Sequence, residues 1–118
     1  MESLKGLRVL LAEDDFLIAT HLEGILSEHG AQVATVAEVA DLMAVDPSTV
    51  DVAILDHSLT DGEVDGAAER LSDAGVPLIF QSGRETEIRE KWTSATILGK
   101  PVRDEVLLET LAAYRKSA

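Results

Sequence analysis

The stretch that decides the fold is residues 7–15, which read LRVLLAEDD, a short apolar run that ends in acids. Residues 50–56 repeat this pattern as VDVAILD. Apolar runs of this length are typical of strands that are buried on both faces of a parallel sheet. We therefore expect Glu13, Asp14 and Asp56 to follow two such strands and to meet at one edge of the sheet, where α/β proteins bind their ligands.

Outward from these two runs, strand-like and helix-like segments alternate along the chain. We expect strands at residues 7–12, 32–36, 50–55, 77–81 and 95–98, and helices at residues 15–29, 38–45, 64–73 and 103–116. In the second of these helices, Val39, Leu42 and Met43 are expected to face the core. The alternation predicts an α/β fold in which helices cover both faces of a parallel five-stranded sheet.

A further helix, between the fourth and fifth strands, is expected to be weak. Residues 84–92 contain only Ile88 and Trp92 as an apolar pair, four residues apart. Two anchors bury little surface, and short helices are marginal without tertiary support. We therefore expect this segment to be short or mobile.

The composition limits the class of protein. We expect the 118 residues to form one domain, residues 1–118, without a second domain for output. The net charge of −12 argues against a nucleic-acid binder, which must neutralise phosphates with Lys and Arg. The absence of cysteine excludes disulfides and thiolate metal sites. The sequence contains neither a signal-peptide pattern nor an apolar stretch long enough to span a membrane, so we expect a soluble cytoplasmic protein.

The three acids predict a Mg²⁺ site. Mg²⁺ prefers oxygen ligands and retains several waters, so two or so carboxylates suffice to hold it. We expect Asp14 and Asp56 to be direct ligands, Glu13 to act through water, and the main-chain carbonyl of Ser58 to add another oxygen. An aspartate in such a site can also be the nucleophile towards a phosphoryl group.

Two further groups at the same edge fit phosphoryl chemistry. Ser82 follows the fourth strand and Lys100 the fifth. A hydroxyl and an ammonium there can neutralise the charge that develops on the phosphoryl oxygens. Taken singly, each of these residues is more simply a cap, a turn or a solvated side chain. Their combination at the ends of four strands is what points to a site. His57, beside Asp56, is assigned a surface or packing role, because neighbouring side chains in a strand point to opposite faces.

The sequence resembles the receiver domains of two-component response regulators over essentially its whole length. The matching segments are VLLAEDD at 9–15, AILD at 53–56, LTDG at 59–62, QSG at 81–83 and GKP at 99–101. The resemblance implies a flavodoxin-like, doubly wound sheet with strand order 2-1-3-4-5. It also implies that Asp56 is the phosphoacceptor, Glu13 and Asp14 the acidic pair around Mg²⁺, Ser82 the switch hydroxyl and Lys100 the family's lysine. The Lys100–Pro101 bond is a candidate for a cis peptide.

Residues 76–84, VPLIFQSGR, resemble a diverged form of the signature of the FATGUY receivers. These are typically stand-alone, and their fourth helix is often poorly formed. The chain departs from ordinary receivers at Ile97, where an aromatic switch residue usually stands three positions before the lysine. We therefore expect the signal to reach the surface by another route, such as ordering of residues 84–92.

The leading hypothesis is a stand-alone phosphoacceptor that is not itself an enzyme. A histidine kinase or phosphotransfer protein would donate a phosphoryl group to Asp56. The effect would then pass through contact with a downstream protein, or the domain would only drain phosphate from the kinase. The main alternative is a receiver-like docking module that takes no phosphate. A hydrolase with an aspartate nucleophile is disfavoured, because it needs a second acid where this chain has Ser58. A dinucleotide-binding protein is disfavoured, because the first strand is followed by acids and not by a glycine-rich loop.

Overall fold

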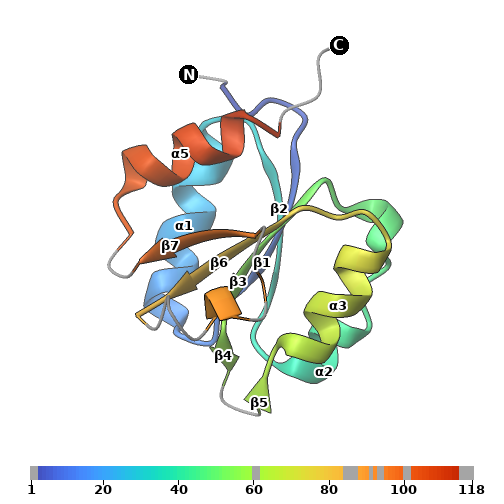
Figure 1. Ribbon diagram of the computed structural model, residues 1–118. Coiled ribbons are helices and arrows are strands. Elements are labelled where there is room, and N and C mark those ends of the chain that lie inside the picture. The colour runs from blue at the N-terminus through green and yellow to red at the C-terminus, as the bar shows by residue number, and fades with distance from the viewer. Residues whose placement is uncertain are drawn as a thin grey trace.

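The fold is an open parallel sheet with strand order β2-β1-β3-β6-β7 (Figure 1). The computed structural model describes residues 3–59, 62–83, 88–90, 92, 95–99 and 102–114. The strands of this sheet are β1 (Arg8–Ala12), β2 (Gln32–Val36), β3 (Val52–Asp56), β6 (Leu78–Ser82) and β7 (Thr96–Gly99). All four neighbouring pairs run parallel. Counted in chain order, the five strands have the predicted order 2-1-3-4-5, and the α/β fold class is confirmed.

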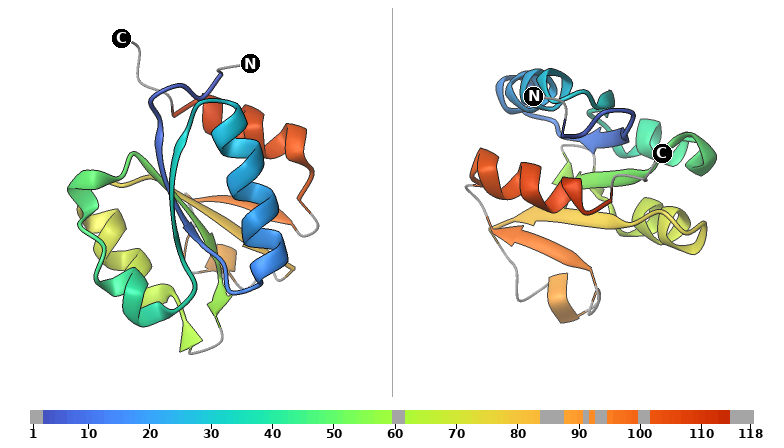
Figure 2. Two further views of the ribbon diagram at one scale, coloured as in Figure 1. Left: turned by 180° about the vertical axis from the view of Figure 1, so that it is seen from behind. Right: turned by 90° about the horizontal axis from the view of Figure 1, so that it is seen from above.

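Helices cover both faces of the sheet (Figures 1 and 2). One face carries α1 (Phe16–Glu28) and α5 (Asp104–Ala112), and the other carries α2 (Val39–Met43) and α3 (Asp65–Asp73). None of the helices that the structure describes has the length and apolarity needed to cross a membrane.

Side chains alternate between the two faces of the sheet along each strand, and they pack into two separate hydrophobic cores. In β1, Val9 and Leu11 pack beneath α1 and α5, whereas Leu10 and Ala12 pack beneath α2 and α3. All four are at most 2% exposed. Strands that are apolar on both faces are what a sheet covered on both sides requires. The ends of β1 and β3 are therefore held firmly, and the acids that follow them start from fixed positions.

Helix α1 begins and ends where local chemistry dictates. The Asp15 carboxylate caps its start by accepting hydrogen bonds from the backbone N–H groups of Leu17 (2.9 Å) and Ile18 (3.2 Å). Gly30 ends it with a φ of +95°, a conformation that side chains rarely adopt. The predicted cap at Asp15 and the predicted stop at Gly30 are both confirmed.

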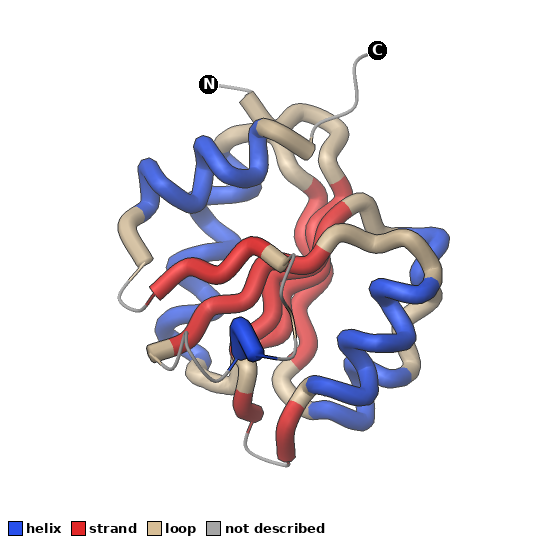
Figure 3. The backbone as a smooth tube through the Cα atoms, in the orientation of Figure 1, coloured by secondary structure: helices blue, strands red, loops and turns tan. Residues whose placement is uncertain are grey.

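Several predicted boundaries and one predicted orientation were wrong. The predicted helix at residues 38–45 is only five residues long as α2, and the 3₁₀ turn Pro47–Thr49 follows it. Met43 is the last residue of α2 and is 44% exposed, because so short a helix buries only Leu42. After Asp56 the chain forms the antiparallel strands β4 (Ser58–Leu59) and β5 (Gly62–Glu63), which were not among the predicted strands and lie apart from the main sheet (Figure 3).

The predicted weak helix falls partly outside the described residues. Residues 88–90 are helical, Ile88 is 1% exposed, and the Trp92 N–H donates to the Ile88 carbonyl at 2.8 Å. Residues 84–87 and 91 lie outside the described part of the chain, so the length of this helix stays a prediction. The two apolar residues that the sequence singled out do pack: Ile88 belongs to the core beneath α2 and α3, and Trp92 packs against that core.

Candidate functional site

Three carboxylates from two strands meet at the carboxyl edge of the sheet. Glu13, Asp14 and Asp56 each offer one oxygen, and these oxygens all lie within 4.8 Å of one another. Glu13 is 2% exposed, Asp56 is half-buried and Asp14 is exposed. The cluster therefore spans the distance from the protein interior to solvent. The predicted convergence of these acids is confirmed.

The register of the sheet produces this convergence. Ala12 of β1 lies opposite Leu55 of β3, so Glu13 and Asp56 are the next residues on two hydrogen-bonded neighbours. The Glu13 N–H donates to the Val36 carbonyl at 3.0 Å, which extends the pairing of β1 with β2 by one more residue. Backbone hydrogen bonds thus hold the acidic turn from the side of β2 as well.

Asp15 has a different task from the two acids before it. Its carboxylate caps α1, as described above, and its own N–H donates to Glu13 Oε2 at 3.2 Å. The turn therefore directs one acid to the helix and leaves Glu13 and Asp14 beside Asp56. The sequence run of three acids divides into one cap and two members of the cluster.

The electrostatics of the cluster favour a cation. Two unit charges about 4 Å apart repel by roughly 1 kcal/mol in bulk water and by roughly 4 kcal/mol at the effective dielectric of a protein surface. A divalent ion among three carboxylates reverses the sign of this contribution. Carboxylate oxygens are also the ligands that Mg²⁺ prefers. The donor set therefore fits Mg²⁺, with Glu13, Asp14 and Asp56 as the residues that would hold it.

The other predicted site residues are placed to different degrees. Ser82 is the last residue of β6, is 7% exposed, and lies opposite Gly99 at the end of β7. Lys100 and Pro101 follow Gly99 directly but lie outside the described residues, so the amine and the cis peptide stay predictions. Ser58 opens β4 opposite Glu63. The part of its carbonyl as a ligand also stays a prediction.

Sequence reasoning missed a polar residue beneath the site. Gln81 lies opposite Asp56 in the pairing of β3 with β6 and is only 3% exposed. Its side chain lines a cavity of about 550 Å³ between α1 and the start of α5. Among the described residues, its Nε2 has no hydrogen-bond partner. The sequence did not reveal this burial, because a glutamine at the end of an apolar strand is equally typical of an exposed strand end.

The surroundings of His57 were predicted only in outline. Its ring packs edge-on against Phe80, with centroids 6.2 Å apart, and its Nε2 lies 3.3 Å from Asp65 Oδ1. The structure thus gives His57 a packing role, as expected. The link to Asp65 could not be foreseen, because it joins a strand end to a helix start and follows no sequence period.

No protein-family model matches the chain. The uncharacterized transcriptional regulatory protein YbdJ of Bacillus subtilis is 36% identical over 83 residues, which are 69% of this chain. The chain spans only 37% of the length of that relative.

Solved structures show the same fold at lower identity. The non-phosphorylated HemR receiver domain of Leptospira biflexa superposes with a TM-score of 0.82 at 22% identity, covering 95% of this chain and 96% of that one. The receiver domain of the sensor histidine kinase PA1611 from Pseudomonas aeruginosa, which has a magnesium ion coordinated in its active-site cleft, gives 0.80 at 21% identity, covering 95% and 99%. The chain therefore has the fold of response regulator receiver domains, and the resemblance seen in the sequence is confirmed at the level of the fold.

Proposed function

We propose that this chain is a Mg²⁺-dependent phosphoacceptor domain of a two-component system, with Asp56 as the phosphorylated residue. The observation that carries the proposal is the meeting of Glu13, Asp14 and Asp56, whose carboxylate oxygens lie within 4.8 Å of one another on a receiver fold. The magnesium ion in the cleft of the PA1611 receiver domain supports the choice of metal.

Asp56 is the acid best suited to be the nucleophile. It ends β3 and is half-buried, so one carboxylate oxygen can face a phosphoryl donor. That oxygen attacks the phosphorus of a phosphohistidine, the bond from phosphorus to the imidazole nitrogen breaks, and an acyl phosphate forms on Asp56. The released imidazole takes up a proton.

The remaining residues manage charge in this step. Mg²⁺, held by Glu13, Asp14 and Asp56, would neutralise charge on the phosphoryl oxygens. The Ser82 hydroxyl and the Lys100 ammonium would do the same from the ends of β6 and β7. Ser58 would contribute its carbonyl to the metal. Together these groups would offset the repulsion between the phosphoryl oxygens and the three carboxylates.

The proposed partners follow from this chemistry. A histidine kinase or a phosphotransfer protein would supply the phosphoryl group inside the cell. A protein partner would read the modified domain, and the domain would convert no separate substrate. With a net charge of −12, neither nucleic acid nor an anionic membrane surface is a fitting partner.

The test is intact-mass measurement after incubation with acetyl phosphate and Mg²⁺. The wild type should gain one phosphoryl group, and Asp56→Asn should gain none. Omission of Mg²⁺ or addition of a chelator should abolish the gain in the wild type. If the wild type gains no mass from acetyl phosphate or from a phosphorylated kinase, the domain is the docking module considered above.

A further inference from the structure

We propose that Asp65 is a positioning residue that couples the phosphoacceptor loop to Trp92, so that the indole responds to the state of Asp56. This inference rests on the proposed function and adds a route by which phosphorylation of Asp56 changes the structure around Trp92. It is built on three side chains from separate elements: His57 after β3, Asp65 at the start of α3, and Trp92 before β7.

His57 fixes the backbone next to Asp56. Its N–H donates to the Gln81 carbonyl at 3.4 Å, and its carbonyl accepts from the Val64 N–H at 3.2 Å. Its side chain adds the contacts with Phe80 and Asp65. Because His57 follows Asp56 directly, a displacement of the Asp56 backbone must strain or break some of these four contacts.

Asp65 joins His57 to Trp92 through a single oxygen. Its Oδ1 lies 3.3 Å from His57 Nε2 and accepts a hydrogen bond from Trp92 Nε1 at 3.2 Å. The His57 and Asp65 side chains are only 17% and 23% exposed, so water competes poorly for these bonds. A shift of the imidazole therefore changes the environment of the oxygen that holds the indole.

Phe80 provides a second contact between the same two residues. Its ring packs edge-on against His57 and lies 5.4 Å from the Trp92 ring, at an interplanar angle of 43°. Phe80 is fully buried, so it cannot move away from either neighbour into solvent. His57 and Trp92 are thus connected by a shared acceptor and by a shared aromatic surface.

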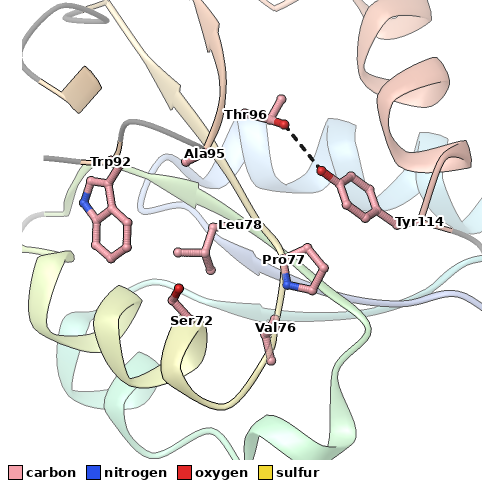
Figure 4. Close-up of a pocket in the computed structure, with 8 residues that line it drawn as sticks. All are labelled: Ser72, Val76, Pro77, Leu78, Trp92, Ala95, Thr96 and Tyr114. Atoms are coloured by element: carbon pink, nitrogen blue, oxygen red, sulfur yellow. Dashed lines mark hydrogen bonds between the residues drawn. The ribbon is translucent and has the colours of Figure 1, made fainter. Parts of the chain in front are cut away.

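Trp92 has room to respond. The residue is half-buried and lines a cavity of about 210 Å³ together with Ser72, Leu78 and Tyr114 (Figure 4). An indole released from Asp65 can therefore turn towards open space and change its exposure to water. Trp92 is also the single tryptophan of the chain, so intrinsic tryptophan fluorescence reports on this position alone.

The test follows Trp92 emission and intact mass in the same samples, with acetyl phosphate and Mg²⁺ as the reagents. In the wild type, the emission shift should grow in proportion to the mass adduct. In Asp65→Ala, samples compared at the same adduct fraction should lose the shift. Asp65→Asn, whose amide oxygen still accepts hydrogen bonds, should restore it. Asp73→Ala, an exposed acid at the other end of α3, is the matched control and should behave as wild type.

A second measurement requires no phosphorylation. His57→Phe keeps an aromatic ring against Phe80 but removes the ring nitrogen that faces Asp65, and it should shift Trp92 emission in the unmodified protein. The same change made in Asp65→Ala should add no further shift. Two results overturn the coupling: a full emission response in Asp65→Ala, or an unchanged emission in wild-type samples that carry the adduct. Absence of any adduct in the wild type overturns the proposed function itself and, with it, this inference.

Discussion

Ala12 and Leu55 lie opposite each other in the parallel pairing of β1 with β3. Each is the last fully buried residue of its strand, and an acid follows each one directly. The site is therefore a consequence of sheet register, because a slip of one residue in either strand would turn its side chains to the opposite face. Two apolar strands that must be buried bring like charges together that would otherwise stay apart.

We predict that Asp14→Asn changes stability in opposite directions with and without metal. In a chelator, the free energy of unfolding should rise by about 1 kcal/mol, because one like-charge repulsion is removed. With Mg²⁺ present, Asp14→Asn should gain less stability from the metal than the wild type does. The reason is that its affinity for Mg²⁺ should be lower by about tenfold or more, or at least about 1.4 kcal/mol. Urea unfolding in both conditions measures this difference. Asp73→Asn is the control, and an equal gain from Mg²⁺ in Asp14→Asn would contradict a metal site.

Replacement by alanine should change the stability of the fold in opposite directions at Gly24, inside α1, and at Gly30, just after it. A Cβ on Gly30 would lie 2.8 Å from Lys5 Cα, and its φ is +95°, so Gly30→Ala should destabilise the fold by about 1–3 kcal/mol. Gly24, inside α1, has open space around a built Cβ, so Gly24→Ala should stabilise by about 0.5–1 kcal/mol. Thermal unfolding of both variants checks this pair. Similar effects at the two positions would show that the backbone at Gly30 differs from that described.

The α1 boundaries were predictable because local signals set both ends. Asp15 is a capping residue before an apolar periodic run, and Gly30 is a typical helix stop. β2 was also predicted with its observed bounds, Gln32–Val36. By contrast, β4 and β5 have two residues each, too few to show any alternation. Met43 was placed in the core because its spacing fits a longer helix than the one that forms.

Some features of the candidate site were likewise predictable from the sequence, and others were not. The convergence of Glu13, Asp14 and Asp56 was predictable, because each lies at the end of a strand, or just after it, and the sequence indicates the type and direction of these strands. The contact of Asp65 with His57 and Trp92 was not, because it depends on how α3 and the segment before β7 pack on the sheet. Periodicity places residues on faces, whereas side-chain partners from distant elements need the tertiary structure.

Gln81 should be replaceable by an apolar residue with a gain in stability. Its buried Nε2 has no hydrogen-bond partner among the described residues, and an unsatisfied buried donor costs about 1–3 kcal/mol. Gln81→Leu should therefore raise the free energy of unfolding by about 1 kcal/mol. Gln32→Leu, at an exposed position of β2, should change it by less than about 0.5 kcal/mol. A loss of stability in Gln81→Leu would mean that the amide is satisfied.

Asp46 should contribute stability that depends on pH. Hydrogen bonds from the Ser48 N–H (3.0 Å) and hydroxyl (2.8 Å) lower the pKa of Asp46 from its usual 3.8. A lowered pKa in the folded state stabilises the fold above the unfolded-state pKa, and the effect is lost as pH falls through the folded-state pKa. Asp46→Ala should therefore melt below the wild type near neutral pH, and the gap should narrow below about pH 4. A difference in melting temperature that stays constant across this range would show that the hydrogen bonds from Ser48 do not stabilise the Asp46 carboxylate.

The most direct test of the central claim is to locate the phosphoryl group. The protein is incubated with Mg²⁺ and acetyl phosphate, the acyl phosphate is reduced with borohydride to homoserine, and the peptides are sequenced by mass spectrometry. Our account predicts homoserine at position 56 and at no other acid, and none in the absence of Mg²⁺. Modification of Glu13 or Asp14 in its place, or an unmodified residue 56 in protein that carries the mass adduct, would contradict it.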